Sequence, residues 1–120
     1  MAESRLSIAS KQVGPVTVLT LAGQMTLDDG DLAFRQAVHD LLDEGRNRIV
    51  VDLAALTYVD SSGVGMLAGK LKTVRDAGGD MKLVHVESKN QRVLGMMKLL
   101  STFEVFDDED SAVRSFDWKG

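Results

Sequence analysis

The residues whose types and spacing could support chemistry are gathered in one segment, DSSGVG at residues 60–65. An apolar strand is expected to lead through a short turn into this segment, and a helical pattern follows it, so Asp60 or Ser61 is placed to cap the helix. The other side chain would lie beside backbone N–H groups that have no partner within the helix. A seryl hydroxyl at this position is within reach of a kinase, and a helix N-terminus stabilises a phosphate. The position of the segment therefore indicates a helix cap, at which a phosphate on Ser61 would be tolerated.

Other chemistry is conceivable from the same residues. Ser61, Asp60 and His85 could form the nucleophile, acid and base of a small hydrolase, although the sequence has no GxSxG motif. The glycines of DSSGVG match neither a Walker A loop nor a dinucleotide-binding fingerprint. His39 has Asp43 four residues later, which indicates a solvated pair on a helix, and two distant histidines make no metal motif. We expect no cofactor, no metal ion and no enzymatic activity.

The composition excludes several classes of protein. The chain has 120 residues, of which 44% are hydrophobic and 27% charged, a balance typical of a globular domain. The absence of cysteine excludes a thiol nucleophile and a disulfide scaffold, and it fits a reducing cytoplasm, where we expect the protein. The net charge of −4 argues against nucleic acid as a partner, and no apolar run is long enough for membrane insertion. We expect one domain over residues 1–120, with its core at about 5–117.

Strands and helices are predicted to alternate along the chain, which indicates an α/β fold. A turn at residues 13–15 joins the first two strands as an antiparallel hairpin, and the later strands are expected to be parallel because helices separate them. The expected strands cover residues 5–11, 16–22, 49–53, 81–86 and 103–106. The expected helices cover residues 26–45, 61–78, 88–100 and 107–116, and the acidic residues from Asp107 to Asp110 are expected to place negative charge at the start of the last helix. The order β-β-α-β-α-β-α-β-α describes a mostly parallel mixed sheet with an N-terminal hairpin and about four helices.

The helix after Ser61 has two different faces. The helical period directs one set of apolar side chains inward: Val64, Leu67, Ala68 and Leu71. The opposite face carries Ser62, Gly65, Met66, Gly69 and Lys70. Two glycines four residues apart each cost a helix about 1 kcal/mol relative to alanine, so they require a reason. They admit either a loop of the same chain or a partner, for which Met66 would be an adaptable apolar contact.

The run VVDLAALTYVDSSGVGML, at residues 50–67, resembles the signature of the STAS domain found in bacterial anti-sigma-factor antagonists. The resemblance extends from the first hairpin to FEVFDDEDSAVRSF near the C-terminus, and it implies the STAS fold. In that family the serine directly after the aspartate is phosphorylated by a partner kinase, which is the anti-sigma factor itself. Carried over, the phosphorylated residue is Ser61 and the aspartate before it is Asp60. From the helix pattern, we expect Ser62, Gly63, Gly65, Met66 and Gly69 to complete the surrounding loop and partner-binding surface.

The resemblance also implies a mechanism of partner switching. The unphosphorylated protein would bind the anti-sigma factor kinase and release a sigma factor, phosphorylation of Ser61 would weaken that binding, and a phosphatase would restore it. The family often has an acidic G-E-[IL]-D segment after the second strand, whereas Gln24, Met25 and Thr26 follow Gly23 here. This departure keeps an alternative open: a lone STAS subunit of an ABC-type lipid transport system, or another STAS scaffold that does not use phosphorylation.

Overall fold

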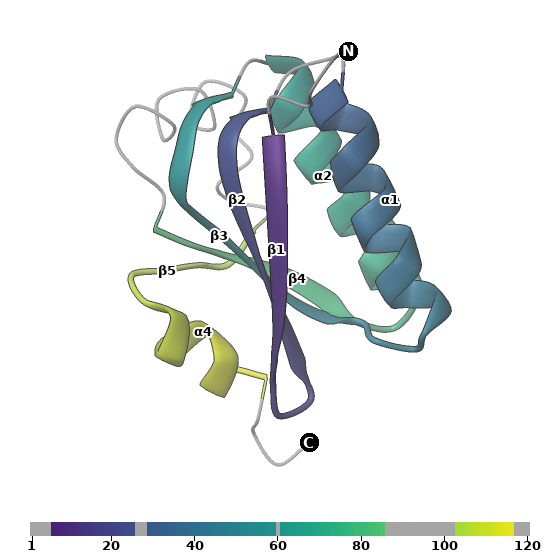
Figure 1. The fold of residues 1–120 in the computed structure, drawn as a ribbon. Coiled ribbons are helices and arrows are strands. Elements are labelled where there is room, and N and C mark those ends of the chain that lie inside the picture. The colour runs from purple at the N-terminus through teal and green to yellow at the C-terminus, as the bar shows by residue number, and fades with distance from the viewer. Residues whose placement is uncertain (1–5, 26–28, 60, 86–102, 117–120) are drawn as a thin grey trace.

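The computed structural model describes residues 6–25, 29–59, 61–85 and 103–116 (Figure 1). The described elements are β1 Leu6–Val13, β2 Val16–Met25, α1 Asp29–Asp43, β3 Arg48–Val59, α2 Ser61–Asp76, β4 Asp80–Val84, β5 Val105–Phe106 and α4 Glu109–Arg114. This order confirms the predicted alternation of strands and helices. The helix predicted at residues 88–100 lies outside the described residues, and the described part of the chain contains the other three predicted helices.

The described strands form one sheet in the order β1-β2-β3-β4-β5. β1 pairs with β2 in antiparallel orientation, and the three other pairings are parallel, so the predicted mixed sheet is confirmed. A two-residue turn joins β1 to β2, and Gly14 at its first position has a φ of 61°. Glycine adopts this left-handed conformation without strain, and the turn closes the hairpin at the edge of the sheet.

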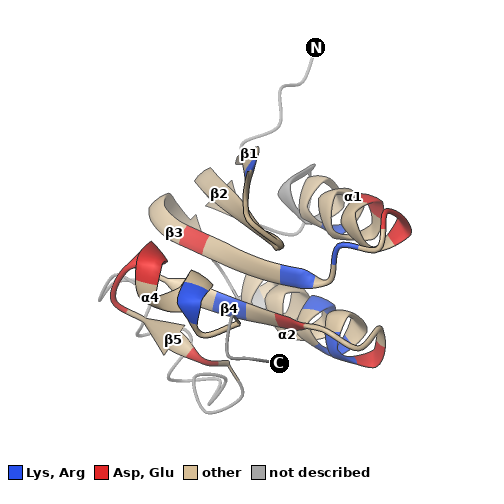
Figure 2. Cartoon of the chain, turned by 90° about the horizontal axis from the view of Figure 1, so that it is seen from below, with Lys and Arg blue, Asp and Glu red and all other residues tan. Residues whose placement is uncertain are grey.

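The sheet has a core on each face, because successive side chains of a strand point to opposite sides. Leu19, Ile49 and Val51 belong to the larger cluster, which α1 and α2 complete. Val18 and Val50 belong to a smaller cluster with residues of α4. Figure 2 shows α4 apart from α1 and α2. The sheet is thus a central layer, and its larger core lies under the two long helices.

β3 is longer than the sequence pattern predicts. We expected a strand at residues 49–53 followed by a turn, but the strand continues to Val59 and remains paired with β2, where Met25 is opposite Val59. The pairing register shifts twice, between Thr20 and Ala22 and between Gly23 and Gln24. Such irregularities bend and twist a strand pair, and they break the alternation that would have revealed the extension. The expectation of a turn before residue 59 was wrong.

α4 is capped by an aspartate. The Asp108 carboxylate accepts hydrogen bonds from the backbone N–H of Ser111 at 3.0 Å and from the Ser111 hydroxyl at 2.9 Å. These two bonds, the backbone one first, hold the pKa of Asp108 below its usual value. The predicted role of the acidic residues between Asp107 and Asp110, negative charge at the start of the last helix, is confirmed.

A lysine is buried between β4 and α4. The Lys82 side chain is only 8% exposed, and its Nζ lies 2.8 Å from a Glu104 carboxylate oxygen and 2.7 Å from the Ser115 hydroxyl. The same nitrogen is 4.4 Å from the ring centroid of Phe116. The charge of Lys82 is therefore matched by an acid, a hydroxyl and an aromatic face within the domain.

Candidate functional site

The candidate site lies where β3 ends and α2 begins. Val59 is the last residue of β3 and Ser61 is the first residue of α2, so a single residue separates the strand from the helix. Asp60 and the Ser61 side chain lie outside the described residues, as do Thr26 and its neighbours at residues 27–28. The first turn of α2 contains no acidic residue. A phosphate on Ser61 would therefore meet the positive end of the helix dipole without a like charge in that turn.

Gly63 connects the site to the sheet. This glycine is buried, and a Cβ atom added to it would lie 2.5 Å from the Met25 carbonyl oxygen and 2.7 Å from Cγ2 of Val59. A real side chain does not tolerate such distances, so the absence of one allows the first turn of α2 to pack on the ends of β2 and β3. Gly63 thus has a packing role in this fold, and its predicted part in partner binding stays a prediction.

The outer face of α2 is open. We refer to Ser62, Gly65, Met66, Gly69 and Lys70 together as the α2 surface. Its serine and both glycines are exposed, and its other two residues are half-buried. A Cβ atom added to Gly65 or Gly69 would meet nothing within 4 Å. Close packing against a loop of the described chain is therefore not the reason for glycine at these two positions.

The inner face of α2 agrees with the helical period. Val64, Leu67 and Leu71 are buried in the larger core, as predicted. Ala68 was also expected to point inward, and it is only half-buried. Met66, which was expected on the outer face, is also half-buried and packs against the larger core, so the apolar face of α2 is displaced toward Met66 relative to the predicted one.

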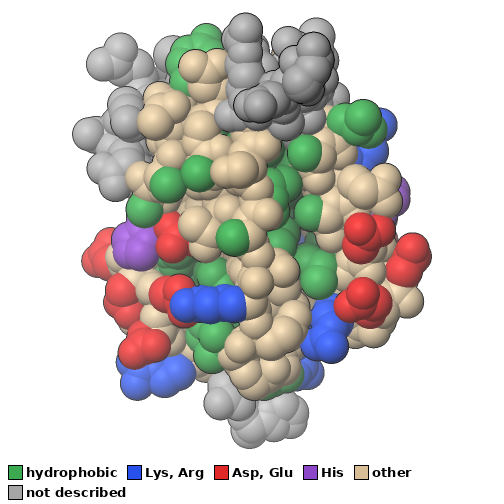
Figure 3. Space-filling view, viewed as in Figure 1, with side chains coloured by type: hydrophobic (Ala, Val, Ile, Leu, Met, Phe, Trp, Pro, Cys, Tyr) green, Lys and Arg blue, Asp and Glu red, His purple; other side chains and the backbone are tan. Residues whose placement is uncertain are grey.

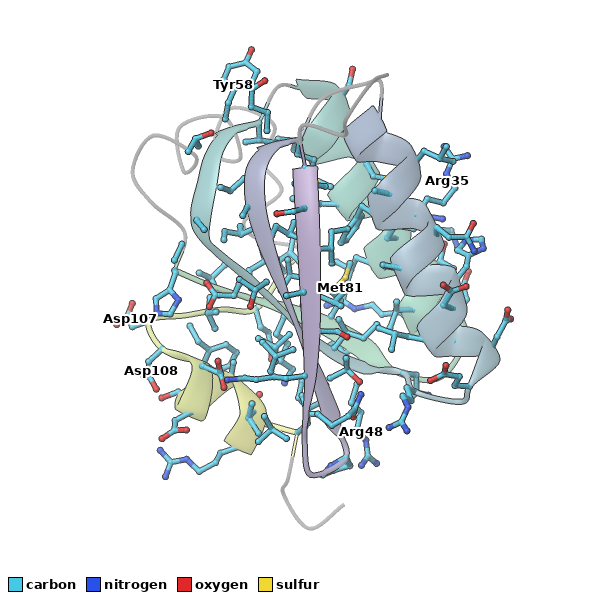
Figure 4. The ribbon with its side chains drawn as sticks, viewed as in Figure 1. Arg35, Arg48, Tyr58, Met81, Asp107 and Asp108 are labelled. Carbon is cyan, nitrogen blue, oxygen red and sulfur yellow. The ribbon has the colours of Figure 1, made fainter. Side chains whose placement is uncertain are left out.

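Two exposed apolar side chains lie near the site, and the sequence analysis missed both. Tyr58, next to the end of β3, is 52% exposed, and Figure 4 shows it projecting away from the sheet at the same end as the start of α2. Leu32, in the first turns of α1, is 61% exposed. The sequence did indicate that Leu32 is exposed, because this residue falls outside the apolar stripe of α1 that includes Phe34 and Val38.

The α2 surface borders α1 through a polar contact. The Lys70 ammonium lies 3.1 Å from Nε2 of His39, which belongs to the exposed face of α1. The two side chains lie within hydrogen-bond distance of each other, so this contact joins the outer faces of the two helices. The pairing predicted between His39 and Asp43 is absent from the described contacts, in which Lys70 is the partner of the histidine.

His85 occupies a different position from the one expected. β4 ends at Val84, so His85 follows the strand and has a φ of 58°, a conformation that is uncommon for residues with a side chain. Its Nδ1 lies 2.9 Å from an Asp52 carboxylate oxygen, and the same oxygen accepts from the backbone N–H of Ala54. Asp52, rather than a residue of the 60–65 segment, is therefore the described partner of His85.

The described residues show neither a metal-binding cluster nor a membrane-spanning helix. Nowhere among them do three or more histidine, aspartate or glutamate side chains gather as a metal ion would require. None of the described helices has the length and apolar character needed to cross a membrane.

Known proteins resemble this chain both in sequence and in structure. The family model for the STAS domain matches residues 7–112. The anti-sigma F factor antagonist of Paenibacillus polymyxa is 28% identical over 98 residues, which cover 82% of this chain and 84% of that protein. The crystal structure of a putative anti-sigma factor antagonist from Thermotoga maritima superposes with a TM-score of 0.82 at 26% identity, covering 90% of this chain and 92% of that one.

More distant structures share the fold. The anti-sigma factor antagonist SpoIIAA in its unphosphorylated form has a TM-score of 0.70 at 18% identity, covering 92% of this chain and 97% of that one. The phosphorylated form of the Bacillus cell fate determinant SpoIIAA also has a TM-score of 0.70, at 19% identity, with 91% and 99% covered. The predicted α/β fold is therefore the one that these proteins adopt.

Proposed function

Because this chain belongs to the STAS domain family, we propose that it is an anti-sigma factor antagonist that binds an anti-sigma factor through the α2 surface. Binding occupies the anti-sigma factor and releases the sigma factor that it holds. The protein contributes recognition and no catalysis, and any ATP chemistry belongs to the anti-sigma factor, which is also a serine kinase. The relatives named as antagonists support the general role.

The observation that carries this proposal is the open outer face of α2. Gly65 and Gly69 leave the helix backbone accessible over one full turn, and no described atom would meet a side chain at either position. A partner can approach such a backbone closely, and Met66 beside it is half-buried and adaptable. Tyr58 and Leu32, exposed at the same end of the molecule, extend the apolar contact area that a partner would cover.

We place the control of this interaction at Ser61. Phosphorylation would add a charge of about −1.5 to −2 at the start of α2, where the helix N-terminus tolerates an anion, so the fold would be preserved. The phosphate would instead weaken the binding of the partner. An unpaired charge buried in an interface costs several kcal/mol, and about 2.7 kcal/mol already weakens binding 100-fold. A phosphatase that removes the phosphate would restore binding.

The test uses the tagged protein to capture its partner, followed by mass spectrometry of the partner and of Ser61. Ser61→Ala is expected to bind the captured anti-sigma factor as tightly as the native protein does. It is also expected to remain unphosphorylated when that factor and ATP are present. Ser61→Asp is expected to fold normally and to bind about 100-fold more weakly. Equal affinity of the native protein and Ser61→Asp would reject the switch at Ser61.

A charge placed elsewhere provides the matched control. Ala9 is exposed on β1, and its side chain points to the face of the sheet opposite α2, because it alternates with Ile8. Ala9→Asp adds the same charge as Ser61→Asp and is expected to leave partner affinity unchanged. Capture of a transporter ATPase or permease, with Ser61 unmodified, would instead favour the alternative of a transporter subunit.

A further inference from the structure

The free edge of the sheet and the helix beside it form a second candidate interaction surface. β1 is the first strand in the described sheet order, and no described strand lies beyond it. A groove of about 650 Å³ runs between β1 and α1. Figure 3 shows hydrophobic side chains exposed in a hollow between these two elements, with acidic side chains along the α1 side. This groove is separate from the α2 surface.

The hairpin geometry shows which backbone groups of β1 face outward. Val13 and Val16 flank the two-residue turn, so they form a hydrogen-bonded pair. Hydrogen-bonded and non-hydrogen-bonded pairs alternate along an antiparallel ladder. The N–H and C=O groups of Ile8, Ser10 and Gln12 therefore point away from β2, along the open edge. A segment of extended backbone is the ligand that matches such a row of donors and acceptors.

The same three residues also line the groove with their side chains. Across from them, α1 contributes two small residues, Ala33 and Ala37, which leave room above the strand edge. A strand added to β1 would direct every second side chain into this space, because its side chains alternate in the same way. Backbone pairing would supply affinity and the groove would supply selectivity.

The charges of the groove indicate which side chains it accepts. Asp40 and Glu44 lie in its lining together with Arg46, which pairs with Glu44 at 3.1 Å. Asp40 accepts a hydrogen bond from the Gln36 amide at 2.9 Å, and no cation of the described chain pairs with it. A basic side chain on the added strand would meet this carboxylate.

A second copy of this chain fits the edge less well. Two β1 strands paired antiparallel would place two α1 helices side by side on the same face of a joined sheet. α1 contains four aspartates and one arginine, so two net-negative helices would face each other. This repulsion disfavours a dimer at the β1 edge, whereas a basic segment is attracted.

We propose that an extended, basic segment of a partner protein adds as a strand to the β1 edge and lies in the groove between β1 and α1. This proposal does not depend on the function assigned to the α2 surface. A protein that binds an anti-sigma factor through α2 could thereby hold a second protein at the same time.

The test selects peptides from a random library displayed on phage against the full-length protein. The enriched peptides are expected to contain basic residues and alternating apolar residues, and to bind at least about tenfold more weakly to Ser10→Pro. Proline at this position removes an outward-facing N–H and no bond to β2, so the sheet is expected to survive. Ser10→Ala retains the N–H and is the matched control, with unchanged peptide binding.

Two further variants keep the test decisive if Ser10→Pro folds poorly. Ala37→Trp fills the groove from the helix side and is expected to abolish peptide binding, and Asp40→Lys is expected to reduce the binding of basic peptides. Thermal unfolding and circular dichroism report whether each variant is folded. The proposal is overturned if no peptide is enriched, if enriched peptides bind Ser10→Pro and Ala37→Trp as tightly as the native protein, or if sedimentation shows a dimer that Ser10→Pro dissociates.

Discussion

Two glycines of α2, two residues apart, are expected to respond in opposite directions to the same substitution. In Gly63→Ala the new methyl group would lie 2.5 Å from the Met25 carbonyl oxygen and 2.7 Å from Cγ2 of Val59. Carbon atoms normally approach to about 3.5–4.0 Å, so the first turn of α2 must move by about 1 Å or push the strand ends aside. Overpacking of this kind costs about 1–3 kcal/mol of unfolding free energy.

Gly65→Ala meets no such obstacle. Its methyl group would have no atom within 4 Å, and alanine is favoured over glycine in a helix by up to about 1 kcal/mol. The two variants should therefore differ in unfolding free energy by about 2 kcal/mol or more. At this chain length each kcal/mol shifts the melting temperature by about 4 °C, so Gly65→Ala should melt above the native protein and Gly63→Ala clearly below it.

Circular dichroism followed during heating measures both melting temperatures, and urea titration measures the free energies of unfolding. The urea m-values of the two variants should match, because the same surface is exposed on unfolding. If Gly63→Ala proves as stable as Gly65→Ala, then α2 does not pack on the ends of β2 and β3 as described, and the position assigned to the start of α2 is wrong.

Five other substitutions test three separate parts of the structure. Gly65→Leu and Gly69→Leu should abolish binding of the anti-sigma factor at unchanged or higher melting temperature, and a lowered melting temperature in both would reject the α2 surface as a docking site. Asp108→Ala should destabilise the protein at neutral pH. Because the pKa of Asp108 is lowered by folding, its contribution is present above the usual aspartate pKa and is lost at lower pH, so urea titrations should show the difference shrinking below about pH 4. Lys82→Met should change the unfolding free energy by less than about 1 kcal/mol, since methionine keeps the buried packing and the exposed Glu104 carboxylate is hydrated when it loses its partner, whereas Lys82→Ala should cost about 2 kcal/mol or more by urea titration.

Most of the architecture could be predicted from local patterns. The helical period of Val64, Leu67 and Leu71 located α2 and its buried face, and the turn at Gly14 located the N-terminal hairpin. These features depend on residues close together in the sequence, where periodicity and turn chemistry act directly. The candidate phosphorylation site at Ser61 came from the DSSGVG segment and from its resemblance to a family, and it stays a prediction.

Contacts between distant segments required the tertiary structure. The extension of β3 to Val59 depends on its pairing with β2 through two register shifts, which no pattern within β3 encodes. The pairing of His85 with Asp52 joins residues 33 positions apart, and the burial of Lys82 depends on an acid and a hydroxyl supplied by later parts of the chain.

The three glycines of α2 show the difference most directly. The sequence by itself determined that Gly65 and Gly69 weaken a helix and therefore need a reason, because helix propensity is a local property of the backbone. Only the tertiary structure decided what the reason is at each position. Gly63 faces the carbonyl oxygen of Met25, whereas Gly65 and Gly69 face open space. That distinction arises because the ends of β2 and β3 come together under the first turn of α2, an approach determined by the pairing of strands far apart in the chain.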